Sequence, residues 1–300
     1  MDNEKKYSSG FVSLIGRPNV GKSTLLNAFL GEKLSITSRK PQTTRNSIKG
    51  ILSDNDSQVV FLDTPGIHDA KELFNKKIVR EALNALKHID IILFLTEARH
   101  KGLEEDEFIL EELKNSNVTK ILIINKIDMV EREKLLPFVD KYMKKCDFSD
   151  AFMISALKDD GVDTLLHAIK KKLPSGVKYF DDDYITDKPE RFLAAEIIRE
   201  KVFNMTQQEI PYSTAVVISS FKEKHNKNVA VIDAEIIVEK DSQKGIIIGK
   251  GGIMLKRIGA QARRDIENLL NVRVFLKLFV KVSKNWTKSE TKLKEFGHFE

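Results

Sequence analysis

The chain has 300 residues, a length that suggests about two domains, since one hydrophobic core usually serves roughly 100–200 residues. Hydrophobic residues at 41% and charged residues at 31% are typical of a soluble globular protein with a sizeable core. A single cysteine excludes an internal disulfide and favours a reducing compartment. The sequence has neither the apolar run of a signal peptide nor an apolar stretch of membrane-spanning length, so we expect a cytoplasmic protein.

The positive charge is concentrated towards the end of the chain. Residues 221–300 contain 17 Lys and Arg against 10 Asp and Glu, whereas the other 220 residues contain 33 against 34. A basic excess on one segment is the electrostatic footprint of a polyanion partner. A solvated lysine-rich surface has the same composition, so charge alone does not choose between the two interpretations.

The first half of the chain alternates short apolar segments with amphipathic ones. Strands are predicted at Phe11–Ile15, Val59–Leu62, Ile89–Leu95, Lys120–Ile124 and Phe152–Ile154. Helices are predicted at 23–30, about 71–88, 104–115, 131–145 and 161–173, and a hairpin turn at Asp54–Asp56. Strands that alternate with helices form parallel βαβ units, so the expected fold class is α/β with a doubly wound, mainly parallel sheet.

The segment Pro174–Lys188 contains Pro, Gly and a run of aspartates, a composition typical of a linker. After it, the pattern predicts a helix at Glu190–Met205, strands at Thr214–Ser220 and Val229–Val238, two helices within Gly252–Leu270 and a strand at Val272–Val282. This αββααβ order predicts a smaller α+β domain. We therefore divide the chain into a domain at 1–174, a linker at 175–189 and a second domain at 190–300.

The strongest motif is Gly16–Ser23, which matches the P-loop pattern G-x-x-x-x-G-K-[ST] between a strand and a helix. Its glycines let backbone N–H groups point at phosphates, and the helix N-terminus adds its positive dipole end. Lys22 would reach the β- and γ-phosphates, and the Ser23 hydroxyl would ligate Mg²⁺. The predicted nucleotide-binding residues here are Gly16, Arg17, Pro18, Asn19, Val20, Gly21, Lys22, Ser23 and Thr24.

Two further motifs indicate that the base is guanine. Asn125–Asp128 fits N-K-x-D at a strand end, where the Asp128 carboxylate would accept hydrogen bonds from the ring N–H and the exocyclic amine of guanine. The Lys126 stem would cover the base, Asn125 would brace the P-loop, and the Ala156 amide would donate to guanine O6. The predicted base-binding residues are Asn125, Lys126, Asp128, Ser155, Ala156 and Leu157.

Asp63–Gly66 lies at another strand end and fits the D-x-x-G motif. Asp63 would hold Mg²⁺ through water and the Gly66 N–H would meet the γ-phosphate, so GTP and GDP would set this loop differently. The polar stretch Ser35–Asn46 is suited to ordering by the γ-phosphate, with Thr44 as the second Mg²⁺ hydroxyl and Thr43 as the alternative. These motifs add Asp63, Thr64, Pro65 and Gly66 to the nucleotide set, and the predicted magnesium residues are Ser23, Thr44 and Asp63.

With these elements in order, the chain resembles a known family. The run GRPNVGKSTLLN is similar to the TrmE–Era–Der group of bacterial GTPases, and SITSRKPQTTR, DTPGIH, NKID, SAL, YITD and RFLAAEIIREK resemble its Era branch, over about Gly10–Lys284. The resemblance implies slow GTP hydrolysis, because Ile67 stands where Ras-like GTPases place the glutamine that orients the attacking water. Catalysis would rest on Mg²⁺, the phosphate cradle and, as a further hypothesis, a K⁺ ion held with help from Asn19.

The tetrapeptide Gly249–Gly252 fits the GxxG loop of a KH domain, which clamps the backbone of about four nucleotides beside an apolar groove. A bare GxxG is also a common helix-entry turn, but the αββααβ order and the basic excess favour the KH interpretation. The predicted RNA-binding residues are Lys244, Ile248, Gly249, Lys250, Gly251, Gly252, Lys256, Arg257, Arg263 and Arg264.

Similarity to the Era branch implies binding of the 3′ end of 16S rRNA and a role in assembly of the small (30S) ribosomal subunit, by a protein expected to be a monomer. The alternative is a GTPase that acts mainly at the inner membrane surface, where lysines near the C-terminus would meet anionic headgroups. These lysines are Lys281, Lys284, Lys288, Lys292 and Lys294. A peripheral membrane contact is compatible with RNA binding.

Overall fold

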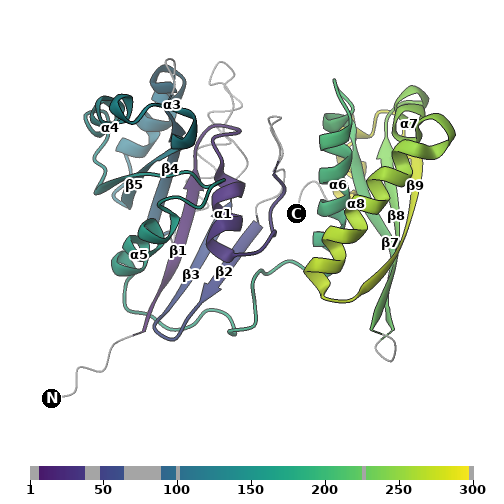
Figure 1. The fold of residues 1–300 in the computed structure, drawn as a ribbon, viewed down its shortest axis with the longest axis horizontal. Helices are drawn as coiled ribbons and strands as arrows, with labels where there is room; N and C mark the ends of the chain where they lie inside the picture. The colour runs from purple at the N-terminus through teal and green to yellow at the C-terminus, as the bar shows by residue number, and fades with distance from the viewer. Residues whose placement is uncertain (1–6, 38–47, 64–88, 99–101, 225–227, 297–300) are drawn as a thin grey trace. The chain divides into compact units, whose positions relative to one another are not determined.

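The computed structural model describes residues 7–37, 48–63, 89–98, 102–224 and 228–296 (Figure 1). Its contacts group the chain into two compact units, one formed by most of the chain up to Asp187 and one formed by the chain from Lys188 onwards. Within the described ranges, no helix is both long enough and apolar enough to span a bilayer.

The first unit is built on a six-stranded sheet with strand order β2-β3-β1-β4-β5-β6. Neighbouring strands are parallel except for β2 and β3, which form an antiparallel hairpin. Asp54 Oδ1 accepts hydrogen bonds from the backbone N–H groups of Asp56 and Ser57, so the predicted hairpin turn is confirmed. The strands are β1 (Ser8–Ile15), β2 (Ile48–Ser53), β3 (Ser57–Asp63), β4 (Ile91–Glu97), β5 (Thr119–Asn125) and β6 (Asp150–Met153).

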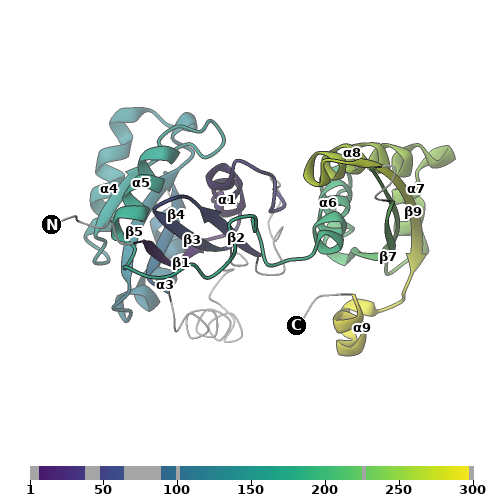
Figure 2. The ribbon, with the colours of Figure 1, turned by 90° about the horizontal axis from the view of Figure 1, so that it is seen from below.

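Helices cover both faces of this sheet (Figure 2). Leu25 of α1 and Leu165 of α5 belong to one buried core, and Leu110 of α3 and Tyr142 of α4 belong to a second. Two cores separated by one sheet are the doubly wound arrangement that the sequence predicts. The helices are α1 (Lys22–Leu30), α3 (Gly102–Lys114), α4 (Leu135–Met143) and α5 (Val162–Lys172). The helix predicted at 71–88 lies outside the described residues.

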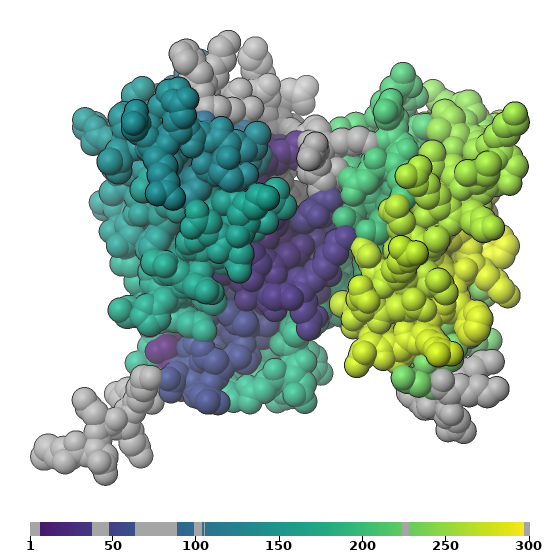
Figure 3. All heavy atoms as spheres, in the orientation of Figure 1, coloured from purple at the N-terminus to yellow at the C-terminus, as the bar shows by residue number. Residues whose placement is uncertain are grey.

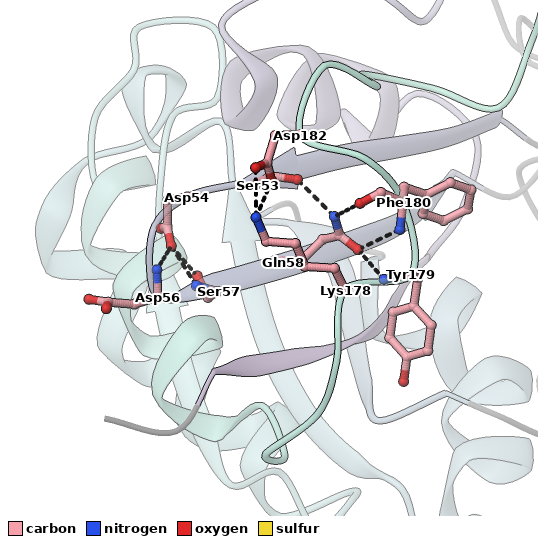
Figure 4. A network of polar contacts seen from close by, with 9 residues as sticks. All are labelled: Ser53, Asp54, Asp56, Ser57, Gln58, Lys178, Tyr179, Phe180 and Asp182. Atoms are coloured by element: carbon pink, nitrogen blue, oxygen red, sulfur yellow. Dashed lines mark hydrogen bonds and ion pairs between the residues drawn. The ribbon is translucent and has the colours of Figure 1, made fainter. Parts of the chain in front are cut away.

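The segment predicted as a linker is hydrogen-bonded to the first unit (Figure 4). Gln58 is fully buried, and its amide nitrogen donates to Ser53 Oγ and to the Phe180 carbonyl at 2.9 and 2.8 Å. Its amide oxygen accepts from the backbone N–H groups of Tyr179 and Phe180 at 2.7 and 3.1 Å. One side chain thus uses its full hydrogen-bonding capacity to hold this segment.

The second unit is a three-stranded sheet of order β7-β8-β9, with β7 antiparallel and β9 parallel to β8. Helices α6 and α8 pack on the same face of the sheet, around residues such as Ile198, Ile232 and Ile258 (Figures 1 and 2). The elements are α6 (Glu190–Met205), β7 (Ala215–Lys224), β8 (Val229–Val238), α7 (Asp241–Ile248), α8 (Ile253–Leu270), β9 (Arg273–Val282) and α9 (Glu290–Glu295). Their order gives the predicted αββααβ pattern.

The placement of the two central helices within Gly252–Leu270 was wrong. The first helix is α7, at Asp241–Ile248, before the glycine loop, and the second, α8, occupies the rest. The glycine and three successive isoleucines of α7 have low helix propensity, so tertiary packing decides the structure of this helix. Ile247 is fully buried, and Gln243 accepts from the Lys240 N–H and donates to Ser213.

We predict that Gln58→Leu loosens the segment around Tyr179. Removing the amide leaves two backbone N–H groups and one carbonyl without their partners, which should cost about 2 kcal/mol locally. Hydrogen exchange over residues 176–186 should therefore accelerate by about tenfold or more. Asn117→Leu, a polar-to-apolar change at an exposed position, is the control. Unchanged exchange in Gln58→Leu would mean that Gln58 does not hold the segment.

Candidate nucleotide site and RNA interface

The P-loop turn lies between β1 and α1, as its motif predicts. Asn19 and Gly21 both have positive φ, at 64° and 104°, which folds the backbone tightly over the start of α1. A Cβ atom at Gly21 would lie 2.1 Å from Asn125 Nδ2, so a larger residue would collide with the side chain that braces this loop. The glycine is therefore required both by its conformation and by its neighbour.

Lys22 is buried inside this turn. Its ammonium group donates to the carbonyls of Gly16 and Arg17 at 2.8 and 3.0 Å. Burial lowers the pKa of Lys22 to about 8, although the Asp63 carboxylate acts in the opposite direction. The cation is thus held at the P-loop, where the β- and γ-phosphates of a nucleotide would relieve its desolvation.

The Arg17 side chain does not line the phosphate cradle. Its Nε donates to Asp106 Oδ1 at 2.5 Å, and both residues are buried. Asp106 Oδ2 also accepts from Thr96 Oγ1 at 2.6 Å and from the Tyr142 hydroxyl at 2.7 Å. Burial and this carboxylate raise the pKa of Tyr142. The side chain of Arg17 therefore anchors the P-loop to α3, β4 and α4.

A hydroxyl and a carboxylate meet where Mg²⁺ is expected. Ser23 Oγ donates to Asp63 Oδ2 at 2.7 Å, and Asp63 is fully buried at the end of β3. Hard oxygen ligands next to a phosphate cradle suit Mg²⁺, so these two residues fit the ion. Ser35, which the sequence placed in the polar stretch but not among the magnesium residues, donates its hydroxyl to the same carboxylate oxygen at 2.9 Å. Asn27 Oδ1 in turn accepts from the Ser35 N–H at 2.8 Å.

The guanine motif is joined to the P-loop by one amide. Asn125 Nδ2 donates to the Val20 carbonyl at 2.8 Å, so the predicted brace is present. Asn125 Oδ1 accepts from the Ala156 N–H at 3.0 Å. The amide that the sequence assigned to guanine O6 therefore already has a protein partner, and a base contact would have to share it.

Asp128 is held in position by the loop after β6. Ser155 Oγ donates to Asp128 Oδ1 at 2.5 Å, which links the N-K-x-D and S-A-L motifs. Lys126 has a positive φ of 62° and pairs with Glu97 Oε2 at 2.6 Å, whereas Leu157 is exposed. Glu97, at the end of β4, is a neighbour of this motif that no sequence pattern indicated. The predicted residues Thr43, Thr44, Thr64, Pro65, Gly66 and Ile67 lie outside the described residues.

In the second unit, the glycine loop connects α7 to α8. Gly249, Gly251 and Gly252 have φ of 72°, 61° and 79°, a conformation that residues with a Cβ rarely adopt. A Cβ at Gly249 would also lie 2.8 Å from the Met254 side chain. Space is open beside Gly251 and Gly252, so a ligand can approach their backbone closely.

A groove of about 470 Å³ runs from this loop between α8 and β9. Its apolar lining includes Leu276 and Leu278. Gly259 allows α8 to pack closely against β9, since a Cβ atom added at this position would lie 3.3 Å from the Leu278 side chain. Helix α8 lies at the surface of the unit (Figure 3, yellow-green). Among the predicted cations, Lys256 and Arg263 line the groove, whereas Lys244, Lys250, Arg257 and Arg264 are not part of its lining.

The fold and both sites have counterparts among known protein families. Residues 11–126 match the model of a family described as 50S ribosome-binding GTPase, and residues 209–287 match a KH domain model. The class of protein is therefore a P-loop GTPase with a C-terminal KH domain.

Relatives define the family more narrowly. The chain is 53% identical over 296 residues to GTPase Era of Geobacter metallireducens, and the match covers 99% of both chains. It is 54% identical over 295 residues to GTPase Era of Geotalea uraniireducens, and this match covers 98% of this chain and 99% of the relative. A crystal structure of Era in complex with MgGDPNP and nucleotides 1506–1542 of 16S ribosomal RNA is 42% identical, with a TM-score of 0.90 over 98% of this chain and 100% of that chain. The chain belongs to the Era family of GTPases.

We predict that Asp128→Asn changes base preference. An amide cannot accept from both guanine N–H donors, so GTP affinity should fall by about 100-fold, or roughly 3 kcal/mol for two weakened bonds. Affinity for xanthosine triphosphate should rise, because the amide can donate to the carbonyl that replaces the guanine amine. Titration calorimetry with both nucleotides measures this, with the exposed Asp147→Asn as control. Full GTP affinity in Asp128→Asn would remove Asp128 from the base site.

Proposed function

We propose that this GTPase is a nucleotide-dependent switch that binds the 3′ end of 16S rRNA through its KH domain and assists assembly of the small ribosomal subunit. The observation that carries the proposal is the groove beside Gly249–Gly252, in the same chain as a P-loop and a guanine motif. A related Era structure that contains MgGDPNP and 16S rRNA nucleotides supports it. The protein would act in the cytoplasm as a monomer.

In the GTPase site, each described residue has a distinct task. Lys22 places a cation against the β- and γ-phosphates, and Asn125 fixes the P-loop relative to the base motif. Ser23 and Asp63 would hold Mg²⁺, which neutralises phosphate charge during hydrolysis. Positioning and charge stabilisation supply most of the catalysis in phosphoryl transfer, so a slow intrinsic rate is compatible with this residue set.

In the RNA site, the loop and the groove divide the work. The open backbone at Gly251 and Gly252 would approach the sugar–phosphate chain, and Leu276 and Leu278 would form the apolar floor for the bases. Lys256 and Arg263, on the wall formed by α8, would face phosphates. A short unpaired RNA segment fits this arrangement, since stacked duplex bases could not enter such a groove.

We predict that Lys250→Asp weakens RNA binding. The change removes a cation and adds an anion inside the glycine loop, so affinity for single-stranded 16S rRNA should fall by about tenfold or more. The slope of log affinity against log salt should flatten by roughly 0.7 for the lost phosphate contact. Filter binding across a salt series measures both quantities.

Lys141→Asp on α4 is the matched control, because it makes the same charge change at an exposed position far along the chain from the loop. Thermal unfolding of both variants checks that each is folded. If Lys250→Asp and Lys141→Asp bind RNA equally well, the loop is not the clamp. Loss of binding to anionic vesicles, with RNA affinity intact, would favour the membrane alternative.

We further propose that K⁺ assists hydrolysis. Asn19, in the left-handed turn of the P-loop, is the residue that would help to hold the ion near the β–γ bridge. GTP hydrolysis should then be several-fold faster in potassium chloride than in sodium chloride, and Asn19→Ala should remove the difference. Phosphate release in the two salts is the measurement. Equal rates, or an Asn19→Ala variant that keeps the difference, would refute a role for the cation.

A further inference from the structure

Strand β9 forms one edge of the KH sheet, and its alternate residues lie on opposite faces. Leu276 and Leu278 line the groove beside α8. Phe275, Lys277 and Phe279 therefore lie on the outer face, away from α6 and α8. Both phenylalanines are largely exposed, at 64% and 55%. Single exposed apolar residues are common, but two large rings on one face of one strand are a feature that folding does not explain.

The exposed rings alternate with cations. Arg273 and Lys277 flank Phe275 on β9. Val231 of β8 is paired with Phe275 on one side and with Lys222 of β7 on the other, so Lys222 lies on the same face. Within the described ranges, no acidic side chain pairs with Arg273, Lys277 or Lys222. We refer to these residues as the basic-aromatic face, formed by Lys222, Arg273, Phe275, Lys277 and Phe279.

Acidic residues on this face of the sheet are fewer than the cations. Asp233 and Glu235 of β8 lie in register with Lys277 and Phe279. Glu235 is already engaged by Lys281, whose ammonium group is 3.4 Å from the carboxylate. The cations therefore exceed the anions across this surface, which favours an anionic partner.

The protein covers the other end of this face with its own C-terminal residues. Trp286 is almost fully buried against Ala215 and Ile237, and Leu293 and Phe296 pack on the same cluster. Apolar residues of the outer face are thus shielded where α9 reaches them. The outer face of the sheet is therefore covered around Trp286 but exposed at Phe275 and Phe279, within the basic-aromatic face.

We infer that the basic-aromatic face is a second RNA-binding surface, which holds nucleotides that flank the segment in the groove. Aromatic side chains on an open sheet stack with unpaired bases, and interleaved lysines meet the phosphates. The four residue steps from Phe275 to Phe279 span about 13 Å, enough for two separate stacking positions. One RNA can contact both surfaces by passing around the edge formed by β9.

This inference rests on the proposed function, so the test uses two RNAs. One is an unpaired 3′-terminal segment of about ten nucleotides, long enough for the groove, and the other contains nucleotides 1506–1542, as in the related complex. In the full-length chain, each of Phe275→Ala and Phe279→Ala should weaken binding of the long RNA by about tenfold, as expected for one lost stacking partner. Binding of the short RNA should change by less than about twofold.

Matched variants separate stacking from other effects. Phe275→Trp should retain affinity for the long RNA and Phe275→Leu should not, because only the former keeps an aromatic face. Leu136→Ala, at an exposed position of α4, controls for loss of exposed apolar surface. Thermal unfolding checks that each variant is folded.

The outcomes are distinguishable. Long-RNA affinity equal to wild type in Phe275→Ala/Phe279→Ala overturns the second surface and leaves the groove proposal standing. An equal loss for both RNAs also overturns it, because the variants would then act through the groove. If the double variant instead loses binding only to vesicles that contain phosphatidylglycerol, the face is a membrane contact. Unaltered binding of both RNAs in Lys250→Asp would count against the glycine loop as the clamp and would leave the basic-aromatic face untouched.

Discussion

The nucleotide site depends on the buried amide of Asn125. Its nitrogen fixes the P-loop through the Val20 carbonyl, and its oxygen fixes the loop after β6 through the Ala156 N–H. In the proposed function, these two loops would recognise opposite ends of the nucleotide, the phosphates and the base. Because Gly21 approaches this side chain too closely for any Cβ, the position of the amide also dictates a glycine in the P-loop. A single planar group thereby sets the distance between the two recognition elements.

Other buried polar groups extend this principle to the surrounding loops. Asp106 ties Arg17 to three secondary-structure elements, and Gln58 ties the backbone at Tyr179 to the sheet. Such groups are stabilising only when their partners are all in place, since a buried unpaired donor or acceptor costs about 1–3 kcal/mol. A small displacement of one of these loops would therefore break buried hydrogen bonds outright. This property suits a protein whose loops must adopt defined positions around a ligand.

Local motifs made much of the fold and of the nucleotide site predictable. Gly16–Ser23 and Asn125–Asp128 place their groups by short-range backbone geometry, so the sequence alone locates them. Asp106 was missed, although its spacing of three and four residues from Ile109 and Leu110 on α3 places it on the buried face. Helix α7 was misplaced because its propensity is weak and its packing is long-range. The Asp-rich segment after Pro174 has the composition of a linker, but composition cannot reveal that the buried Gln58 forms hydrogen bonds with its backbone.

Lys22 shows how such a site couples stability to ligand binding. Burial lowers its pKa from 10.5 to about 8, so between these values the unfolded chain binds more protons than the folded one. The cost of keeping the buried cation is therefore fully present below pH 8, at about 3 kcal/mol, and disappears as pH rises towards 10.5. A bound phosphate favours the charged form and offsets that cost at neutral pH. The P-loop thus contains a charge that is less stable alone than with its ligand, and part of the nucleotide's binding free energy must come from relieving it.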